Sequence, residues 1–225
     1  MKIILALILS AVANFVFAGV ATIYDDPGFV TYQSNNNFRG FYRGSLGMFS
    51  CGFLFFGKGD LFEPRGSENS IFKIATFMAI PNSGRFKYEQ RDPRADIGGR
   101  LYVTANKIAI TTDSTHGGCL GVAGFFDAPP GQRGVIEFSQ ENKMEATGIF
   151  VIGKRVLLFK NPDRRESIGS LLSASLVIAL RRKGQSVQVR YVNPDLQIDD
   201  ENPRKKIIGW VRSMDLVDPF PSPLK

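Results

Sequence analysis

The chain has 225 residues, with 28 lysines and arginines against 21 aspartates and glutamates, and a formal net charge of +7. Its single histidine and two cysteines exclude a metal site built from several histidines, and they make a zinc centre improbable. We therefore expect no metal ion and no cofactor. The length allows either one large β domain or two small domains.

Residues 1–18 have the pattern of a cleavable secretory signal peptide. Lys2 supplies the positive charge, residues 3–12 are apolar, and Val16 and Ala18 are the small residues that precede a cleavage site. The apolar stretch is too short to cross a hydrocarbon layer of about 30 Å. We expect cleavage near Ala18 and a mature protein that is periplasmic or secreted. The alternative is an uncleaved N-terminal anchor helix.

Residues 19–150 are predicted to form a β domain, either a compact barrel or a sandwich. The region is balanced in charge, with 13 basic and 13 acidic residues, and it holds fifteen of the nineteen phenylalanines. Short apolar or alternating runs separated by glycine-rich and proline-rich turns are typical of β-strands. These runs are residues 41–50, 52–56, 71–80, 101–105, 108–112, 134–138 and 146–152. The pair around Asn106 and Lys107 predicts a β-hairpin.

Cys51 and Cys119 are predicted to form a disulfide bond, because an exported chain with an even number of cysteines favours pairing. Closing a loop of this length would restrict the unfolded chain by roughly 4 kcal/mol in the entropic model. The alternative is a nucleophilic Cys119 with His116 as its base, three residues upstream. Nucleophile and base usually converge from separate segments, and Gly117 and Gly118 make this stretch a turn. The sequence therefore favours the structural role.

No other catalytic pattern in the sequence has the context that its chemistry requires. Residues 44–47 read Gly-Ser-Leu-Gly, but they lack the strand, turn and helix of a nucleophile elbow. The acidic residues at 25–26 and at 199–201 are adjacent along the chain. Adjacent side chains of an extended chain point apart, so no general acid and base can be assigned to them. We expect a protein that is not an enzyme.

Residues 151–225 form a second, basic region, with 14 basic and 8 acidic residues. Two runs can focus the positive potential, Arg181-Arg182-Lys183 and residues 204–206. An exported basic surface would bind anionic envelope polymers, phospholipid head groups or an acidic protein, and nucleic acid is not expected as a partner. Peripheral contact with a membrane is compatible with this charge. The alternative is that the charge serves only solubility.

The same region resembles a bacterial SH3 domain. The resemblance covers residues 156–159, 161–162, 167–171, 176–180, 187–191 and 209–216, and its most specific part is the closing Gly-Trp-Val-x-x-x-x-Leu. It implies a small, non-catalytic β barrel that binds peptidoglycan peptides or proteins. Two departures are Ser186, where the family usually has an aromatic residue, and an enlarged polar segment at residues 193–204. The candidate binding residues are Arg181, Arg182, Lys183, Tyr191, Trp210 and Arg212, although Trp210, as the sole tryptophan, is better suited to a core position than to a ligand platform.

A shorter resemblance lies in residues 83–88, Ser-Gly-Arg-Phe-Lys-Tyr, which look like the Ser-Gly-x-x-Tyr loop of periplasmic lysozyme inhibitors with one additional residue. Lysozymes are usually basic, so a partner with a positive charge would be repelled from them. The resemblance therefore supports an exported inhibitor in general, and lysozyme itself is a weak candidate for its target.

The sequence as a whole predicts an all-β chain: a signal peptide at 1–18, a disulfide-closed β domain at 19–150 and a basic SH3-like domain at 151–225. We expect an exported, non-enzymatic protein that binds an envelope component or an envelope-acting protein, including an immunity protein that blocks a toxin. One alternative is a cell-wall hydrolase, or its accessory, targeted by the SH3-like domain. Another is a secreted factor that acts on a different organism. The oligomeric state is not predicted.

Overall fold

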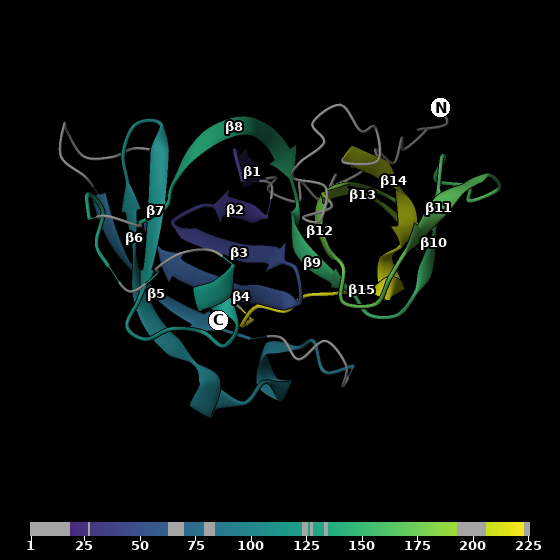
Figure 1. The fold of residues 1–225 in the computed structure, drawn as a ribbon. Helices are drawn as coiled ribbons and strands as arrows, with labels where there is room; N and C mark the ends of the chain where they lie inside the picture. Colours follow the sequence, from purple (N-terminus) through teal and green to yellow (C-terminus); the bar gives the residue numbers. More distant parts are fainter. Residues whose placement is uncertain are drawn as a thin grey trace, which may run out of the picture.

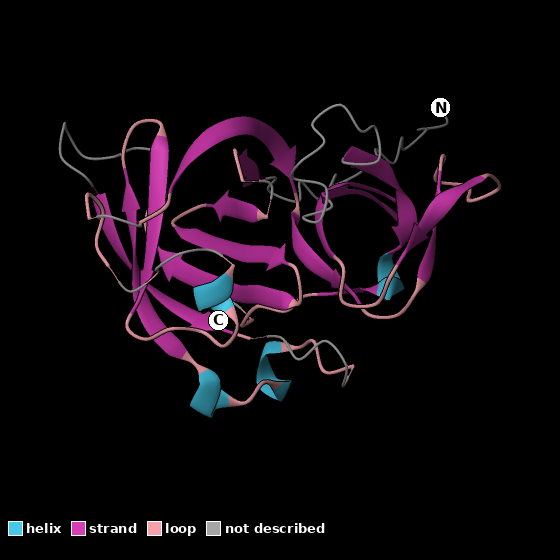
Figure 2. Cartoon of the chain, viewed as in Figure 1, coloured by secondary structure: helices cyan, strands magenta, loops and turns pink. Residues whose placement is uncertain are grey.

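The computed structural model of the chain is all-β, as predicted, and its strands are joined by loops and single turns of 3-10 helix (Figure 2). It describes residues 19–26, 28–62, 70–78, 84–122, 126, 128–132, 135–192 and 206–222. The predicted signal peptide and the polar segment at residues 193–204 lie outside the described residues. Within the described part of the chain, no helix is long and apolar enough to cross a membrane.

The first eight strands form a closed antiparallel barrel, so the predicted barrel or sandwich is a barrel (Figure 1). The strands are β1 (Gly19–Tyr24), β2 (Phe29–Ser34), β3 (Asn37–Leu46), β4 (Phe49–Lys58), β5 (Ser70–Phe77), β6 (Ile97–Val103), β7 (Lys107–Thr112) and β8 (Glu137–Ala146). The barrel closes where β1 pairs with β8, with Gly19 opposite Ala146. The predicted hairpin at Asn106 and Lys107 is confirmed as β6 and β7.

Phenylalanine rings fill the inside of the barrel. Phe29 stacks between Phe55 and Phe138, with ring centroids 5.6 and 4.3 Å apart. Glycines make room for these rings, because a Cβ atom added at Gly40 would collide with the Phe55 ring and one at Gly57 with the Phe38 ring. This alternation of small and large side chains gives a packed core. Packing inside the barrel therefore accounts for six buried phenylalanines, which are Phe29, Phe38, Phe53, Phe55, Phe126 and Phe138.

A second, seven-stranded sheet follows, with the strand order β11-β10-β14-β13-β12-β9-β15. Its strands are β9 (Gly148–Ile152), β10 (Val156–Phe159), β11 (Ser167–Leu171), β12 (Leu176–Lys183), β13 (Ser186–Val192), β14 (Lys206–Arg212) and β15 (Leu216–Val217). Only Thr147 separates β8 from β9. The change of sheet thus occurs at Thr147, and the division expected after residue 150 falls inside β9.

The barrel and the second sheet lie side by side and share a buried apolar cluster (Figure 1). Strand β4 shows why: Phe53 and Phe55 point into the barrel, whereas Leu54 points outward into the shared cluster. A strand that is buried on both faces has a continuous apolar sequence, as residues 53–56 do. The buried members of the shared cluster are Ala21, Ile23, Val30, Tyr32, Phe41, Leu54, Phe77, Ala146, Ile149, Ile178 and Phe220.

Candidate functional site

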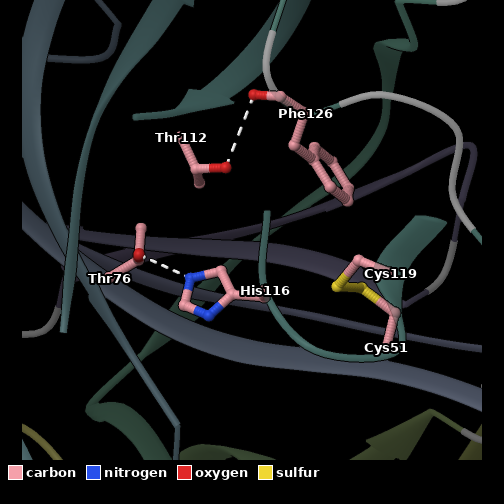
Figure 3. Close-up of a disulfide and its surroundings, with 6 residues drawn as sticks. All are labelled: Cys51, Thr76, Thr112, His116, Cys119 and Phe126. Carbon is pink, nitrogen blue, oxygen red and sulfur yellow. Dashed lines mark hydrogen bonds between the residues drawn. A yellow bond between two sulfur atoms is a disulfide. The ribbon is translucent and has the colours of Figure 1, made fainter. Parts of the chain in front are cut away.

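The predicted disulfide between Cys51 and Cys119 is present, and both residues are buried (Figure 3). Cys51 lies on β4, and Cys119 begins the 3-10 turn η4 (Cys119–Gly121). The bond therefore fastens the segment between β7 and β8 to the start of β4. Because its sulfur is bonded to Cys51, Cys119 has no thiol to act as a nucleophile.

His116 is buried beside the disulfide and has a structural environment. Its ring stacks on Phe53 at a centroid distance of 4.7 Å, and its Nε2 atom lies 2.7 Å from the Thr76 hydroxyl (Figure 3). Thr76 donates its single hydroxyl proton to the carbonyl of Ile97, so His116 Nε2 is the donor in this contact. Burial lowers the pKa of His116 to about 4. The imidazole is therefore neutral at pH 7 and held in one tautomer.

The basic residues predicted to bind a partner lie at the ends of β12 and β14. Arg181, Arg182, Lys183 and Arg212 are exposed. The strand register places Lys183, Ser186 and Arg212 in one row across three strands. Arg182, Lys183 and Arg212 form no ion pair with another described residue. The fold thus gathers these charges at one end of the second sheet.

Trp210 and Tyr191 offer less surface to a partner than the sequence suggested. Trp210 is only 5% exposed, and the Arg181 guanidinium lies 5.6 Å from its ring. Ser186, which stands at the position of the missing aromatic residue, is buried and donates a hydrogen bond to the carbonyl of Pro162 at 2.9 Å. Tyr191 is half-buried against the core of the second sheet. The segment at Pro162 therefore lies against Ser186, the position where the family usually has an aromatic residue.

The residues that resemble a lysozyme-inhibitor loop contribute to packing. Ser83 lies outside the described residues. Phe86 is buried, and the Tyr88 ring packs edge-on against Phe56 and Phe77. The Arg91 guanidinium lies 3.5 Å from the centroid of the Tyr88 ring. Tyr88 is accordingly held in place by its neighbours.

An exposed apolar turn joins β3 to β4. Leu46, Met48 and Phe49, here called the β3–β4 tip, are 63%, 91% and 53% exposed. Leu120 is also 63% exposed, and it follows the cysteine that is bonded to Cys51 near this tip. The alternating pattern of residues 41–50 predicted a strand here, but it did not reveal that these side chains face solvent. Contiguous exposed apolar side chains commonly mark interaction sites.

A pocket of about 200 Å³ lies where the barrel meets the second sheet. One wall comes from β3 and β4, including Arg43, Ser50 and Gly52, and the opposite wall includes Ala174 and Leu176. Arg43 is the one charged side chain among the described residues of the lining, which is otherwise mostly apolar. The described lining is Tyr42, Arg43, Ser50, Cys51, Gly52, Phe53, Leu54, Met78, Phe86, Val151, Ala174 and Leu176.

Arg190 on β13 is a buried cation that the sequence did not single out. It is 8% exposed, and its Nη1 atom donates to Met144 Sδ on β8 at 3.5 Å. Burial lowers the pKa of Arg190.

Among the described residues, no group of three or more histidine, cysteine, aspartate or glutamate side chains is placed to hold a metal ion.

No protein-family model matches this chain, and neither a curated protein nor a solved structure matches it.

Proposed function

We propose that this chain is an exported, non-enzymatic protein that binds a protein acting at the cell envelope, in the manner of an inhibitor or an immunity protein. The observation that carries the proposal is the β3–β4 tip, where Leu46, Met48 and Phe49 face solvent. Large apolar side chains on a fixed turn are suited to act as anchors in a protein interface. None of these three side chains belongs to a core cluster of the described residues.

The disulfide supports a fixed recognition surface. Cys51 stands two residues after Phe49, and its bond to Cys119 joins β4 to the turn that carries the exposed Leu120. A turn held at its base loses less conformational entropy when a partner binds. A disulfide also forms and persists in oxidising compartments, which agrees with export.

The expected cut would leave the barrel complete. β1 (Gly19–Tyr24) lies after the expected cleavage site, and it closes the barrel by pairing with β8. Cleavage near Ala18 would therefore keep all eight barrel strands in the mature protein.

The histidine and cysteine that were considered for catalysis have other roles. Cys119 is bonded to Cys51, and His116 is buried, neutral and engaged with Thr76. Neither can serve as a nucleophile or base towards a substrate in this arrangement. This supports binding over hydrolysis as the function.

The basic residues at the ends of β12 and β14 would guide the partner during encounter. Arg182, Lys183 and Arg212 are exposed, so their charges would attract an acidic protein surface over a distance set by the salt concentration. Replacing Arg181, Arg182 and Lys183 with glutamine should slow association more than it speeds dissociation. Raising the salt concentration should have the same effect.

Capture from envelope extract with matched baits tests the proposal. The mature protein is compared with a Met48→Ser, Phe49→Ser double variant and with Leu157→Ser, which removes an apolar side chain that is 56% exposed on β10. We expect the native bait and the Leu157→Ser bait to capture the same protein, and the tip variant to lose it. Capture that survives the tip variant overturns the proposal. So does hydrolysis of peptidoglycan, peptide or lipid by the purified protein, and so does binding to isolated cell-wall polymer without a protein partner.

A further inference from the structure

The pocket at the junction has one wall on the barrel and one on the second sheet. Arg43 and Gly52 are cross-strand partners on β3 and β4, and both face away from the barrel interior. The opposite wall consists of Val151 on β9 together with Ala174 and Leu176 around the start of β12. Junctions between structural units are common places for binding sites.

The size of the pocket limits what it can hold. An apolar protein cavity of about 150 Å³ accommodates benzene. The volume of about 200 Å³ here therefore suits one aromatic or branched aliphatic side chain. Gly52 keeps this space open, because the nearest atom to a Cβ added there would be the Tyr42 carbonyl oxygen at 3.7 Å.

Arg43 gives the pocket a preference for a ligand with a negatively charged group. It is exposed, and it forms no ion pair with another described residue. The Ser50 hydroxyl is a second polar group of the lining. A carboxylate next to the apolar group of a ligand would form a charge-assisted hydrogen bond with the Arg43 guanidinium. An ammonium group in the same place would be repelled.

The wall formed by the second sheet is fixed before any ligand arrives. Ala174 has a φ of +67°, a left-handed conformation that is unfavourable for alanine. Its amide donates to the carbonyl of Ile152 at 2.9 Å, and the Ile152 amide donates to the carbonyl of Ser175 at 2.9 Å. These bonds hold the strained residue in place, and strained residues of this kind cluster at binding sites.

From these observations we infer that the pocket receives an aromatic or branched side chain of the partner that stands beside a carboxylate, with the carboxylate bound by Arg43. The inference rests on the proposed protein-binding function, since it names the anchor of that partner. Ser50, which lines the pocket, directly follows Phe49 of the β3–β4 tip. The tip and the pocket would therefore form one continuous recognition surface.

Small probes test the pocket by itself. N-acetylphenylalanine, its neutral amide and N-acetylalanine are titrated into the mature protein while methyl NMR signals of Val151 and Leu176 are followed. We expect N-acetylphenylalanine to shift these signals, the amide to bind about fivefold more weakly, and N-acetylalanine to have no effect. No shift with N-acetylphenylalanine, or equal binding of acid and amide, overturns the inference.

Two variants and their controls complete the test. Gly52→Leu fills the pocket and should abolish the shifts, whereas Ser170→Leu adds the same side chain on β11 and should not. Arg43→Gln should make acid and amide bind equally, whereas Arg165→Gln, which changes an arginine that is 88% exposed outside the pocket, should preserve the difference. Probe binding that survives Gly52→Leu overturns the inference.

Capture experiments separate this inference from the proposed function. If the Gly52→Leu bait keeps a partner that the tip variant loses, the pocket inference fails and the proposed function stands. If the tip variant keeps its partner, the proposed function fails whatever the probes show.

Discussion

Arg39 on β3 and Asp218 after β15 form an ion pair with an Nη1–Oδ2 distance of 3.1 Å, joining residues 179 positions apart across the two units. The Arg39 guanidinium also lies 5.3 Å from the Phe220 ring, and that ring packs edge-on against Phe77 on β5. The segment after β15 thus returns to the barrel and fastens the second sheet to it.

We predict that Phe220 contributes most of this fastening. Phe220 is 3% exposed, and truncating a buried phenylalanine to alanine typically costs about 3 kcal/mol or more. The Asp218 carboxylate is 44% exposed, so Asp218→Asn should cost less than about 1 kcal/mol. Urea unfolding of the two variants gives the comparison. Equal losses in the two variants would contradict the prediction that the buried ring contributes more than the ion pair.

The second sheet should fold alone only if β9 is complete. A fragment that starts at Val151 lacks Gly148, Ile149 and Phe150, which pair with β12. We therefore expect residues 148–222 to give a cooperative unfolding transition and residues 151–222 to give none. Circular dichroism during heating distinguishes them. Cooperative folding of the shorter fragment would show that β9 is dispensable.

The stability of the protein should fall between pH 6.5 and pH 4 because of His116. Its pKa is lowered from 6.5 to about 4 by burial, so the unfolded chain binds a proton in this range while the folded chain does not. Unfolding is therefore favoured as the pH falls, and the stability lost by pH 4 is about 3 kcal/mol. His116→Gln should remove this part of the pH dependence. Parallel stability curves for the two proteins would contradict the assignment.

Removing the disulfide should destabilise the protein and loosen the β3–β4 tip. The bond closes a loop with a sequence separation of 68, for which the entropic model gives roughly 4 kcal/mol. The Cys51→Ser, Cys119→Ser double variant avoids a free thiol, and its urea midpoint should fall accordingly. Hydrogen exchange of the amides of residues 44–52 should also become faster. An unchanged urea midpoint would show that loss of the disulfide gives the unfolded chain little additional conformational freedom.

The sequence predicted the β class, the disulfide and most strand positions, because these depend on local alternation and on cysteine count. The expected division after residue 150 lies inside β9, and the chain changes sheets at Thr147. Residues 146–152 remain apolar through the change of sheet, since both Ala146 and Ile149 enter the shared cluster. Nothing in that local pattern marks Thr147 as the point where the chain leaves the barrel.

Exposure at the candidate site is harder to read from the sequence than strand positions, because it depends on contacts between distant residues. The exposure of Arg212 and of residues 181–183 agrees with their charge. Trp210 is buried on the face that Arg181 covers, and Leu46 and Phe49 are exposed although their spacing fits a buried strand. The pocket was missed because Arg43 and Val151 are brought to it only by the packing of the second sheet on the barrel.

The closure of the barrel between β1 and β8 has a consequence for the order of folding. β1 can pair early with β2, but its other edge stays open until β8, the last strand of the barrel, has been synthesised. Contacts between strands so far apart in sequence form slowly, because a long loop must first be closed. A chain that crosses a membrane through a narrow channel has to arrive there unfolded. Under the export proposed above, this topology would delay the native state until late in synthesis and would leave time for translocation before the barrel closes.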